Sequence, residues 1–238
     1  MADATTLAPL DEDWTRALAV VAHPDDMEYG AASAVARWTE QGKSVAYVLV
    51  TDGEAGIASM PPDQAGPIRR EEQIASCAMV GVHDVEFLGQ PDGLVTESVE
   101  LRRRLAGCIR RQRPDVVLGV NHRDSWGGPS WNHVDHRAVG RALLDAVRDA
   151  ANPWIFADEG EPWDGTRLVA FSGSPQATHA VDVTDSLDRG IASLRCHRTY
   201  LDNLDGAPDP DAMLRDAAAA TGPRLGVALA TSFEVVRP

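Results

Sequence analysis

The stretch AVVAHPDDMEYG, from Ala19 to Gly30, joins a run of small apolar residues to a histidine, a proline and two adjacent aspartates. Short apolar runs rich in valine are typical of strands that are buried on both faces of a sheet. The residues after Asp26 have the apolar spacing of a helix. The stretch therefore predicts a buried strand that meets a helix at a junction whose polar side chains are suited to holding a ligand.

The same alternation continues along the chain. Apolar runs predict strands at 17–22, 44–50, 84–88 and 115–120, and apolar spacing predicts helices at about 28–41, 67–80, 97–112 and 133–150. Strands that alternate with helices indicate right-handed crossovers. The predicted fold class is α/β, a Rossmann-like, mostly parallel sheet with helices on both faces. Ligands bind beyond the carboxyl ends of such strands, so loops 52–67 and 121–132 are candidate sites.

The later part of the chain has a less regular pattern. It predicts strands at 167–172, 180–183 and within 225–236, and helices at 185–200 and 209–220. The length of 238 residues and the absence of a linker-like segment fit one domain. We expect a single domain over 1–238 with its core at about 17–200.

The composition limits the partners. With 22 basic and 36 acidic residues, the formal net charge is −14, which disfavours nucleic acid and favours a neutral or cationic small-molecule substrate. We expect a cytoplasmic protein without a membrane partner, because no secretory leader or long apolar run is found. A homo-oligomer is compatible with these features. Cys77, Cys108 and Cys196 are far apart and are expected to be core or half-buried thiols.

Two short clusters, HPDD at 23–26 and HVDH at 133–136, follow predicted strands. Residues three apart share a helix face, so His133 and His136 can face one site, and Asn132 is expected to cap that helix. Two imidazoles and one carboxylate with an open position form a common catalytic zinc site, although Fe(II) can take the same ligands. Each cluster alone also fits solvated loop residues, and the aspartates also fit carboxylates at a helix N-terminus.

The two clusters also carry a resemblance to a known family. AHPDDMEYG together with NHVDHRAVGRAL resembles the paired signature of the LmbE-like, or PIG-L, family of zinc-dependent N-deacetylases. TDGEAG, IRREEQIASCAMVGV, FLGQPDGLV and RPDVVLGVNHR resemble further family segments, so that the similarity covers about 17–200. One departure is Met27, which precedes Glu28 where many members place an acid directly after the two aspartates.

The resemblance implies roles for individual residues. By position, the resemblance implies that His23, Asp26 and His136 are the zinc ligands and that Asp25 is the general base. It also implies that His133 stabilises the oxyanion and that Asp135 orients an imidazole. It implies hydrolysis of an N-acetylglucosamine-type amide, in conjugates with lipids, thiols, antibiotics or small oligosaccharides. Two alternatives stay open: the same hydrolysis on a non-sugar natural-product intermediate, and a non-catalytic binding module.

Substrate-side residues are expected in the loops. Glu54 is expected to line the pocket or to bond its own loop, and Asp92 to contact a sugar hydroxyl or cap a turn. Arg69 and Arg70 are expected at the start of a helix, a poor place for cations, so a carboxylate or the substrate is expected to hold one of them. The family resemblance implies a substrate-side role for this segment and favours Arg69, from its R-x-x-E spacing to Glu72.

The loop after the fourth strand is aromatic. Trp126 and Trp131 flank a Gly-Gly-Pro segment and are expected either to stack on the substrate or to pack the loop. His122 is expected to contact substrate, with metal ligation as its alternative, whereas His197 is expected to support structure.

Overall fold

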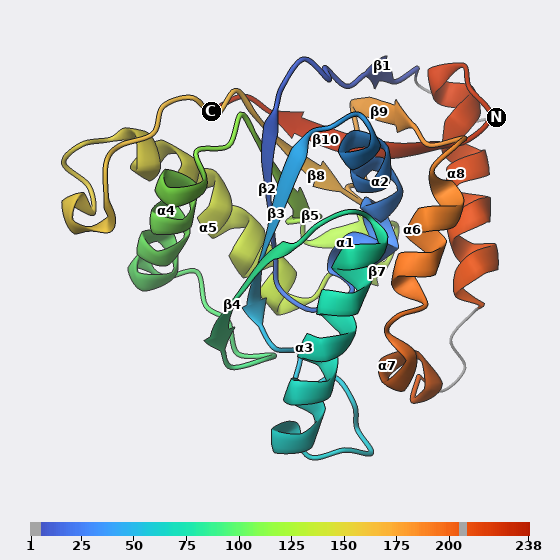
Figure 1. Ribbon diagram of the computed structural model, residues 1–238, viewed down its shortest axis with the longest axis horizontal. Helices are drawn as coiled ribbons and strands as arrows, with labels where there is room; N and C mark the ends of the chain where they lie inside the picture. The colour runs from blue at the N-terminus through green and yellow to red at the C-terminus, as the bar shows by residue number, and fades with distance from the viewer. Residues whose placement is uncertain (1–5, 205–208) are drawn as a thin grey trace.

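The computed structural model describes residues 6–204 and 209–238. Within these ranges the main sheet has eight strands in the order β1-β9-β10-β8-β5-β2-β3-β4 (Figure 1). Its strands are β1 Ala8–Pro9, β2 Arg16–Val21, β3 Ser44–Thr51, β4 Asp84–Gln90, β5 Val116–Val120, β8 Leu168–Ser172, β9 His179–Asp182 and β10 Ala230–Val236. From β8 to β4 the neighbouring strands are parallel, and β10 runs antiparallel to both β8 and β9. The predicted α/β class is confirmed.

Helices cover both faces of this sheet. They are α1 Asp26–Gly30, α2 Ala32–Glu40, α3 Pro62–Met79, α4 Val99–Gln112, α5 Val134–Ala151, α6 Leu187–Leu194, α7 Arg198–Asp202 and α8 Pro210–Leu225, with a 3-10 turn η1 at Ala157–Glu159. Figure 1 shows α4 and α5 on one side of the sheet and α2, α3, α6 and α8 on the other. None of the helices in the described ranges has the length and apolarity that a bilayer crossing requires.

The alternation of side chains along β2 explains the two layers. Ala19 and Val21 belong to the core that includes Trp38 of α2, whereas Leu18 and Val20 belong to the core that includes Leu143 of α5. Successive side chains of a strand point to opposite faces, so a strand that is apolar at every position requires cover on both sides. The valine-rich run that opens the site-bearing stretch is therefore buried completely.

Strand order places the site. The chain runs from β2 outward to β3 and β4 and then returns to β5 on the other side of β2. Loops that leave β2 and β5 diverge at this point, which is where open parallel sheets bind ligands. The HPDD segment follows β2, and a small hairpin of β6 Ser125–Gly127 and β7 Ser130–Trp131 followed by HVDH comes after β5.

Several predicted boundaries are wrong. The helix expected at 28–41 is broken at Ala31, whose φ of −134° is not helical, and Thr231 of β10 donates a hydrogen bond to the carbonyl of Gly30 at the break. The helix expected from 67 begins at Pro62, since proline is accepted at the first helical position, and it continues through Pro67 in its interior. The helix expected at 185–200 is split into α6 and α7.

The cysteines have the predicted environments. Cys77 and Cys108 are buried, Cys196 is partly buried, and all three are free thiols.

Candidate active site and metal centre

A cavity of about 370 Å³ opens beyond the carboxyl ends of β2 and β5. Its walls come from the segments that follow β2, β3, β4, β5 and β8, together with side chains of α3 and α7. Of the residues singled out in the sequence, those that line it are His23, Asp25, Asp26, Arg69, Asp92, Trp126, His133 and His136. The fold thus brings both clusters to one cavity.

Three side chains in this cavity form a compact donor set. Nδ1 of His23, Oδ1 of Asp26 and Nε2 of His136 all lie within 4.8 Å of one another. The two nitrogens are 3.2 Å apart, and Oδ1 of Asp26 lies 2.9 Å from His136 and 3.7 Å from His23. Ligands of a tetrahedral zinc ion, each about 2.1 Å from the metal, lie roughly 3.4 Å from one another. The donor set fits a divalent cation of this size.

Local hydrogen bonds fix the Asp26 carboxylate. Its Oδ2 accepts from the backbone N–H groups of Ala22 and His23, which leaves Oδ1 facing the histidines. Burial alone would raise the pKa of Asp26, but His136 and His23 outweigh it and hold the pKa well below its ordinary value. A carboxylate that stays ionised suits metal ligation.

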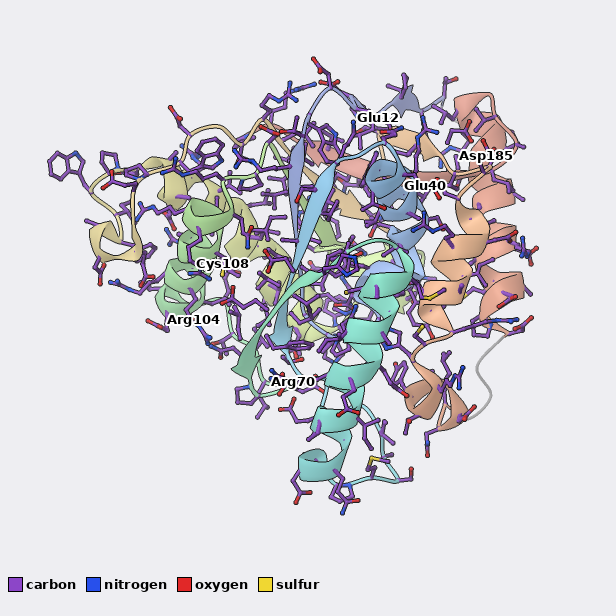
Figure 2. The ribbon with its side chains drawn as sticks, in the orientation of Figure 1. Glu12, Glu40, Arg70, Arg104, Cys108 and Asp185 are labelled. Atoms are coloured by element: carbon purple, nitrogen blue, oxygen red, sulfur yellow. The ribbon has the colours of Figure 1, made fainter. Side chains whose placement is uncertain are left out.

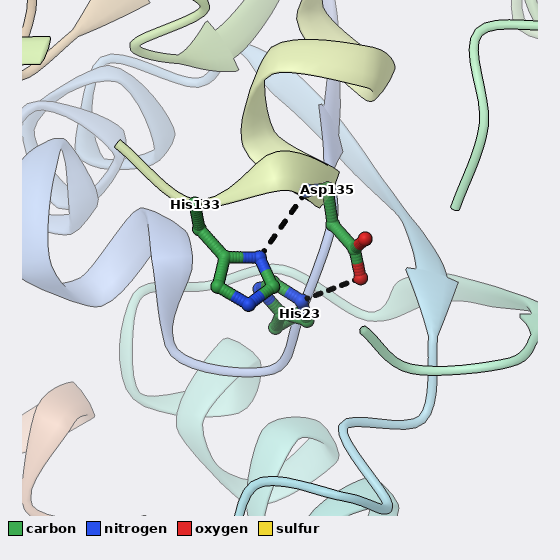
Figure 3. A group of neighbouring side chains, drawn as sticks. All are labelled: His23, His133 and Asp135. Atoms are coloured by element: carbon green, nitrogen blue, oxygen red, sulfur yellow. Dashed lines mark hydrogen bonds and ion pairs between the residues drawn. The ribbon is translucent and has the colours of Figure 1, made fainter. Parts of the chain in front are cut away.

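His23 is held at both ring nitrogens. Nδ1 faces Asp26 and His136, and Nε2 lies 3.0 Å from Asp92. Nε2 also lies 3.2 Å from Asp135 (Figure 3). Burial alone would lower the pKa of His23, yet its bonds to Asp135 and Asp26 raise it well above the usual value. A carboxylate behind a histidine orients the ring and increases its basicity as a ligand.

A second grouping, His23 with His133 and Asp135, is a weaker donor set. Asp135 is fully buried, and its oxygens accept from the backbone N–H groups of Gly93 and Val95 as well as facing His23. Nδ1 of His133 accepts from the backbone N–H of Asp135 (Figure 3). Because these atoms are already engaged, the grouping of His23, Asp26 and His136 is the better metal site.

The cap of α5 differs from the prediction. His133, and not Asn132, is the N-cap residue, and its Nδ1 is the accepting atom. A neutral imidazole that accepts through Nδ1 carries its proton on Nε2, so His133 presents an N–H donor. Asn132 has another task, since its Oδ1 lies 3.0 Å from Nδ1 of His136 and leaves Nε2 of that ring for the donor set.

Asp25 is adjacent to Asp26 but is not part of the donor set. It has a φ of 86°, which is uncommon for a residue with a side chain, and its backbone N–H donates to Oε1 of Gln73. Burial raises the pKa of Asp25 well above the usual value, and the positive charge of Arg69 only partly opposes this shift. The structure therefore places a second carboxylate, with a raised pKa, beside the donor set.

Arg69 supports this carboxylate. Its NH2 donates to Oδ2 of Asp25 and to the carbonyl of Pro24, its NH1 donates to the carbonyl of Gly53, and its guanidinium lies 4.1 Å from the ring centre of Tyr200. A Cβ on Gly53 would approach the guanidinium to within 2.3 Å. The glycine in TDGEAG therefore makes room for Arg69.

The predicted helix position of the two arginines is wrong. α3 begins at Pro62, so Arg69 and Arg70 lie in its middle. Arg70, which is labelled in Figure 2, pairs with Asp52 and does not line the cavity. Glu72, three residues after Arg69, accepts from the backbone N–H of Thr199.

The two acidic loop residues, Asp92 and Glu54, have different surroundings. Asp92 lines the cavity, faces His23 and accepts from the backbone N–H of Ala55. Glu54 lies outside the lining and accepts from the backbone N–H of Asp92, so it joins its own loop to the loop after β4 rather than lining the pocket or bonding within its own loop.

Two residues expected at the substrate lie elsewhere. His122 is buried with its ring 4.3 Å from that of Phe171 and is absent from the cavity lining. Trp131 is 68% exposed outside the cavity, with Arg137 4.8 Å from its ring centre. Trp126 alone of the two tryptophans lines the cavity, and its ring meets that of His136 edge-on at 5.7 Å. The expectation for His122 fails because its side chain turns from the cavity toward the core.

The sequence prediction missed Tyr29, Gln73 and Tyr200. Tyr29 and Tyr200 line the cavity, and Gln73 joins Asp25 to the buried carboxylate of Glu28. Gln73 is four residues after Arg69, so shared helix-face spacing could have found it. No local signal points to Tyr200, which reaches the site only through tertiary packing.

A second carboxylate beside a His-Asp-His donor set, at the switch point of a parallel sheet, is typical of metal-assisted hydrolases. A family model described as PIG-L, GlcNAc-PI de-N-acetylase, matches residues 18–147, and the chain belongs to this family. It is accordingly an amide hydrolase of the N-deacetylase type. The resemblance found in the sequence is confirmed.

Individual proteins support the assignment. The chain is 31% identical over 235 residues to 1D-myo-inositol 2-acetamido-2-deoxy-alpha-D-glucopyranoside deacetylase 2 of Saccharopolyspora erythraea, covering 79% of this chain and 84% of that protein. It is 27% identical over 192 residues to diacetylchitobiose deacetylase of Thermococcus kodakarensis, covering 79% and 70%. Its structure matches N,N'-diacetylchitobiose deacetylase from Pyrococcus horikoshii with a TM-score of 0.84 at 25% identity, covering 95% and 85%.

Proposed function

We propose that this protein is a zinc-dependent N-deacetylase that removes the acetyl group from an N-acetylglucosamine-type sugar or sugar conjugate. The observation that carries the proposal is the pair Asp25 and Asp26. One carboxylate faces two imidazoles in a metal-sized donor set, and its neighbour is buried beside them with a raised pKa. The sugar is proposed because both sequence relatives described above are named for deacetylation of amino-sugar compounds.

His23, Asp26 and His136 would hold the cation. When bound, it supplies Lewis-acid polarisation of the acyl carbonyl and lowers the pKa of water. Imidazole and carboxylate ligands also suit Fe(II), so zinc is the proposed ion rather than the sole compatible one. Asp135 acts behind His23, and Asn132 acts behind His136, as positioning residues.

Asp25 would act as the general base and then as the general acid. It takes a proton from the attacking water as the new C–O bond forms, and it returns the proton to the amide nitrogen as the C–N bond breaks. Its burial raises the pKa, so the carboxyl can keep the proton between the two steps. The products are acetate and the free amine, with no other reactant.

His133 would stabilise the charge that develops on the carbonyl oxygen. Burial and the neighbouring His23 lower its pKa, and its Nδ1 accepts a backbone N–H, so the neutral ring offers Nε2–H to the cavity. A donor placed at a developing oxyanion contributes about 3 kcal/mol to lowering the barrier.

A substrate panel tests the proposal. The zinc-reconstituted protein is assayed for released acetate with N-acetylglucosamine, diacetylchitobiose, an N-acetylglucosaminyl inositol and a non-sugar N-acetyl amine, each beside a chelator-treated sample. We expect cleavage of at least one sugar, and loss of that activity with the chelator. Cleavage of the non-sugar amide alone would contradict the sugar assignment.

A further inference from the structure

The peptide group that joins Pro24 to Asp25 is held at both of its polar atoms by α3. Its carbonyl oxygen accepts from NH2 of Arg69 at 2.8 Å, and its N–H donates to Oε1 of Gln73 at 2.9 Å. Arg69 and Gln73 are four positions apart in the chain, so they lie on one face of the helix. This face of α3 therefore fixes the plane of the peptide group from which the Asp25 side chain departs.

The backbone of Asp25 requires such support. Its φ of 86° and ψ of −16° lie in the left-handed region, which a residue with a Cβ adopts at a cost in free energy. Asp25 is the N-cap residue of α1, yet its side chain makes no capping hydrogen bond and accepts from Arg69 instead. Because the backbone conformation sets the direction of the carboxyl, the bonds that stabilise this conformation also position the proposed base.

Buried groups behind Gln73 orient its amide. Nε2 of Gln73 donates to Oε1 of Glu28 at 3.0 Å and to Sγ of Cys77 at 3.2 Å, and Ser76 donates to the same oxygen of Glu28 at 2.8 Å. Gln73 and Ser76 are fully buried, and Glu28 is 2% exposed. Since the NH2 end of the amide faces the acceptor on Glu28, its oxygen end faces the N–H of Asp25.

Asp26 is held by a different set of groups. Its Oδ2 accepts from two backbone N–H groups of its own segment, and its Oδ1 faces His23 and His136. These partners belong to the segment after β2 and to α5, whereas Gln73 belongs to α3. A change at Gln73 should therefore affect Asp25 and leave the donor set intact.

We propose that Gln73 and Glu28 are positioning residues for hydrolysis, in which Gln73 fixes the backbone of Asp25 and Glu28 fixes the amide of Gln73. This inference rests on the proposed deacetylase function, which makes Asp25 the proton-transfer group. Neither Gln73 nor Glu28 lines the cavity, so both act through the direction of the Asp25 carboxyl. A misplacement of about 1 Å at a reacting group can lower a rate about 10²-fold, so small shifts of this carboxyl are costly.

Gln73→Met tests the first contact. Methionine is similar to glutamine in length but offers no amide oxygen to the N–H of Asp25. With a sugar that the wild type cleaves, kcat should fall about 10- to 100-fold while KM and metal content stay unchanged. Gln112→Met is the matched control, because Gln112 donates to Asp84 at the end of α4 and its loss should leave kcat unchanged. Wild-type kcat in Gln73→Met, or loss of its metal, would overturn the inference.

A double-mutant cycle separates positioning from a general loss of structure. If Gln73 acts through the carboxyl of Asp25, adding Gln73→Met to Asp25→Asn should not lower the residual rate further, because the group that it positions is already absent. A loss by the same factor in both backgrounds would show a general structural role and overturn the inference.

Two variants of Glu28 test the second contact, and they decide the case if Gln73→Met does not fold. Glu28→Gln keeps an oxygen that can accept from Gln73 and should retain most of the wild-type kcat, whereas Glu28→Met removes it and should lose about tenfold. Equal kcat in these two variants would overturn the inference and leave the deacetylase function in place. A wild type that cleaves no sugar of the panel would instead refute the proposed function itself.

Discussion

The two sides of the cavity shift the pKa values of the neighbouring residues Asp25 and Asp26 in opposite directions. On the side of β2 and α5, Asp26 accepts two backbone N–H groups, faces two imidazoles and has a lowered pKa. On the side of α3, Asp25 is buried against Arg69 with a raised pKa. These opposite surroundings of two chemically identical, adjacent residues support the proposed ligand role of Asp26 and the proposed proton-transfer role of Asp25.

The prediction with the largest expected effect removes the carboxylate of Asp26. Asp26→Ala should abolish stoichiometric metal binding and lower hydrolysis by more than about 10³-fold, because both Lewis-acid activation and the ordering of two histidines are lost. Metal analysis and acetate release check it. Asp52→Ala, which removes a surface partner of Arg70, is the matched control and should keep both properties. Full metal content in Asp26→Ala would show that this side is not the binding site.

His133→Ala removes the proposed hydrogen-bond donor to the oxyanion. With the metal retained, kcat should fall about 10²- to 10³-fold, because one preorganised donor to the oxyanion is lost. If KM alone changes, His133 is a binding residue and its proposed role is incorrect.

Asp135→Asn tests the support behind His23. It should weaken metal affinity by about 10- to 100-fold, the usual consequence of removing an outer carboxylate from a ligating histidine. Titration with a competing chelator measures the change. A wild-type affinity would mean that Asp92, which also faces Nε2 of His23, suffices to orient the ring.

Arg69→Gln is the variant with the smallest expected effect, and it tests the contact between α3 and Asp25. The guanidinium favours the ionised form of Asp25, so its removal raises the pKa of that carboxyl further. The acidic limb of the rate profile should therefore move to higher pH. An unmoved limb with full metal content would show that Asp25 does not set it.

Local patterns explain how much of this site the sequence could predict. The apolar run before His23 and the three-residue spacing of His133 and His136 are local signals, so the strand ends, the α5 face and the donor set could be predicted. The family resemblance then supplied the roles. His122 could not be assigned, because its direction toward Phe171 depends on packing between elements.

Long-range contacts explain the rest. Tyr200 packs on Arg69 at the site, and Thr231 bonds to Gly30 at the end of α1. Both residues come from the far end of the chain, and no local sequence pattern predicts either contact. The start of α3 was misplaced because Pro67 resembles a helix boundary. That error put Arg69 at a helix end, although it lies in the helix and holds Asp25.

The most direct test of the central claim compares Asp25→Asn with Asp26→Asn under identical conditions, with metal content and acetate release measured on the same samples. The account predicts that Asp25→Asn keeps about one metal per chain and loses about 10²- to 10⁴-fold in rate, whereas Asp26→Asn loses the metal and the activity together. Asp25→Asn with near wild-type activity, or loss of metal from both variants alike, would contradict the division of labour between the two carboxylates.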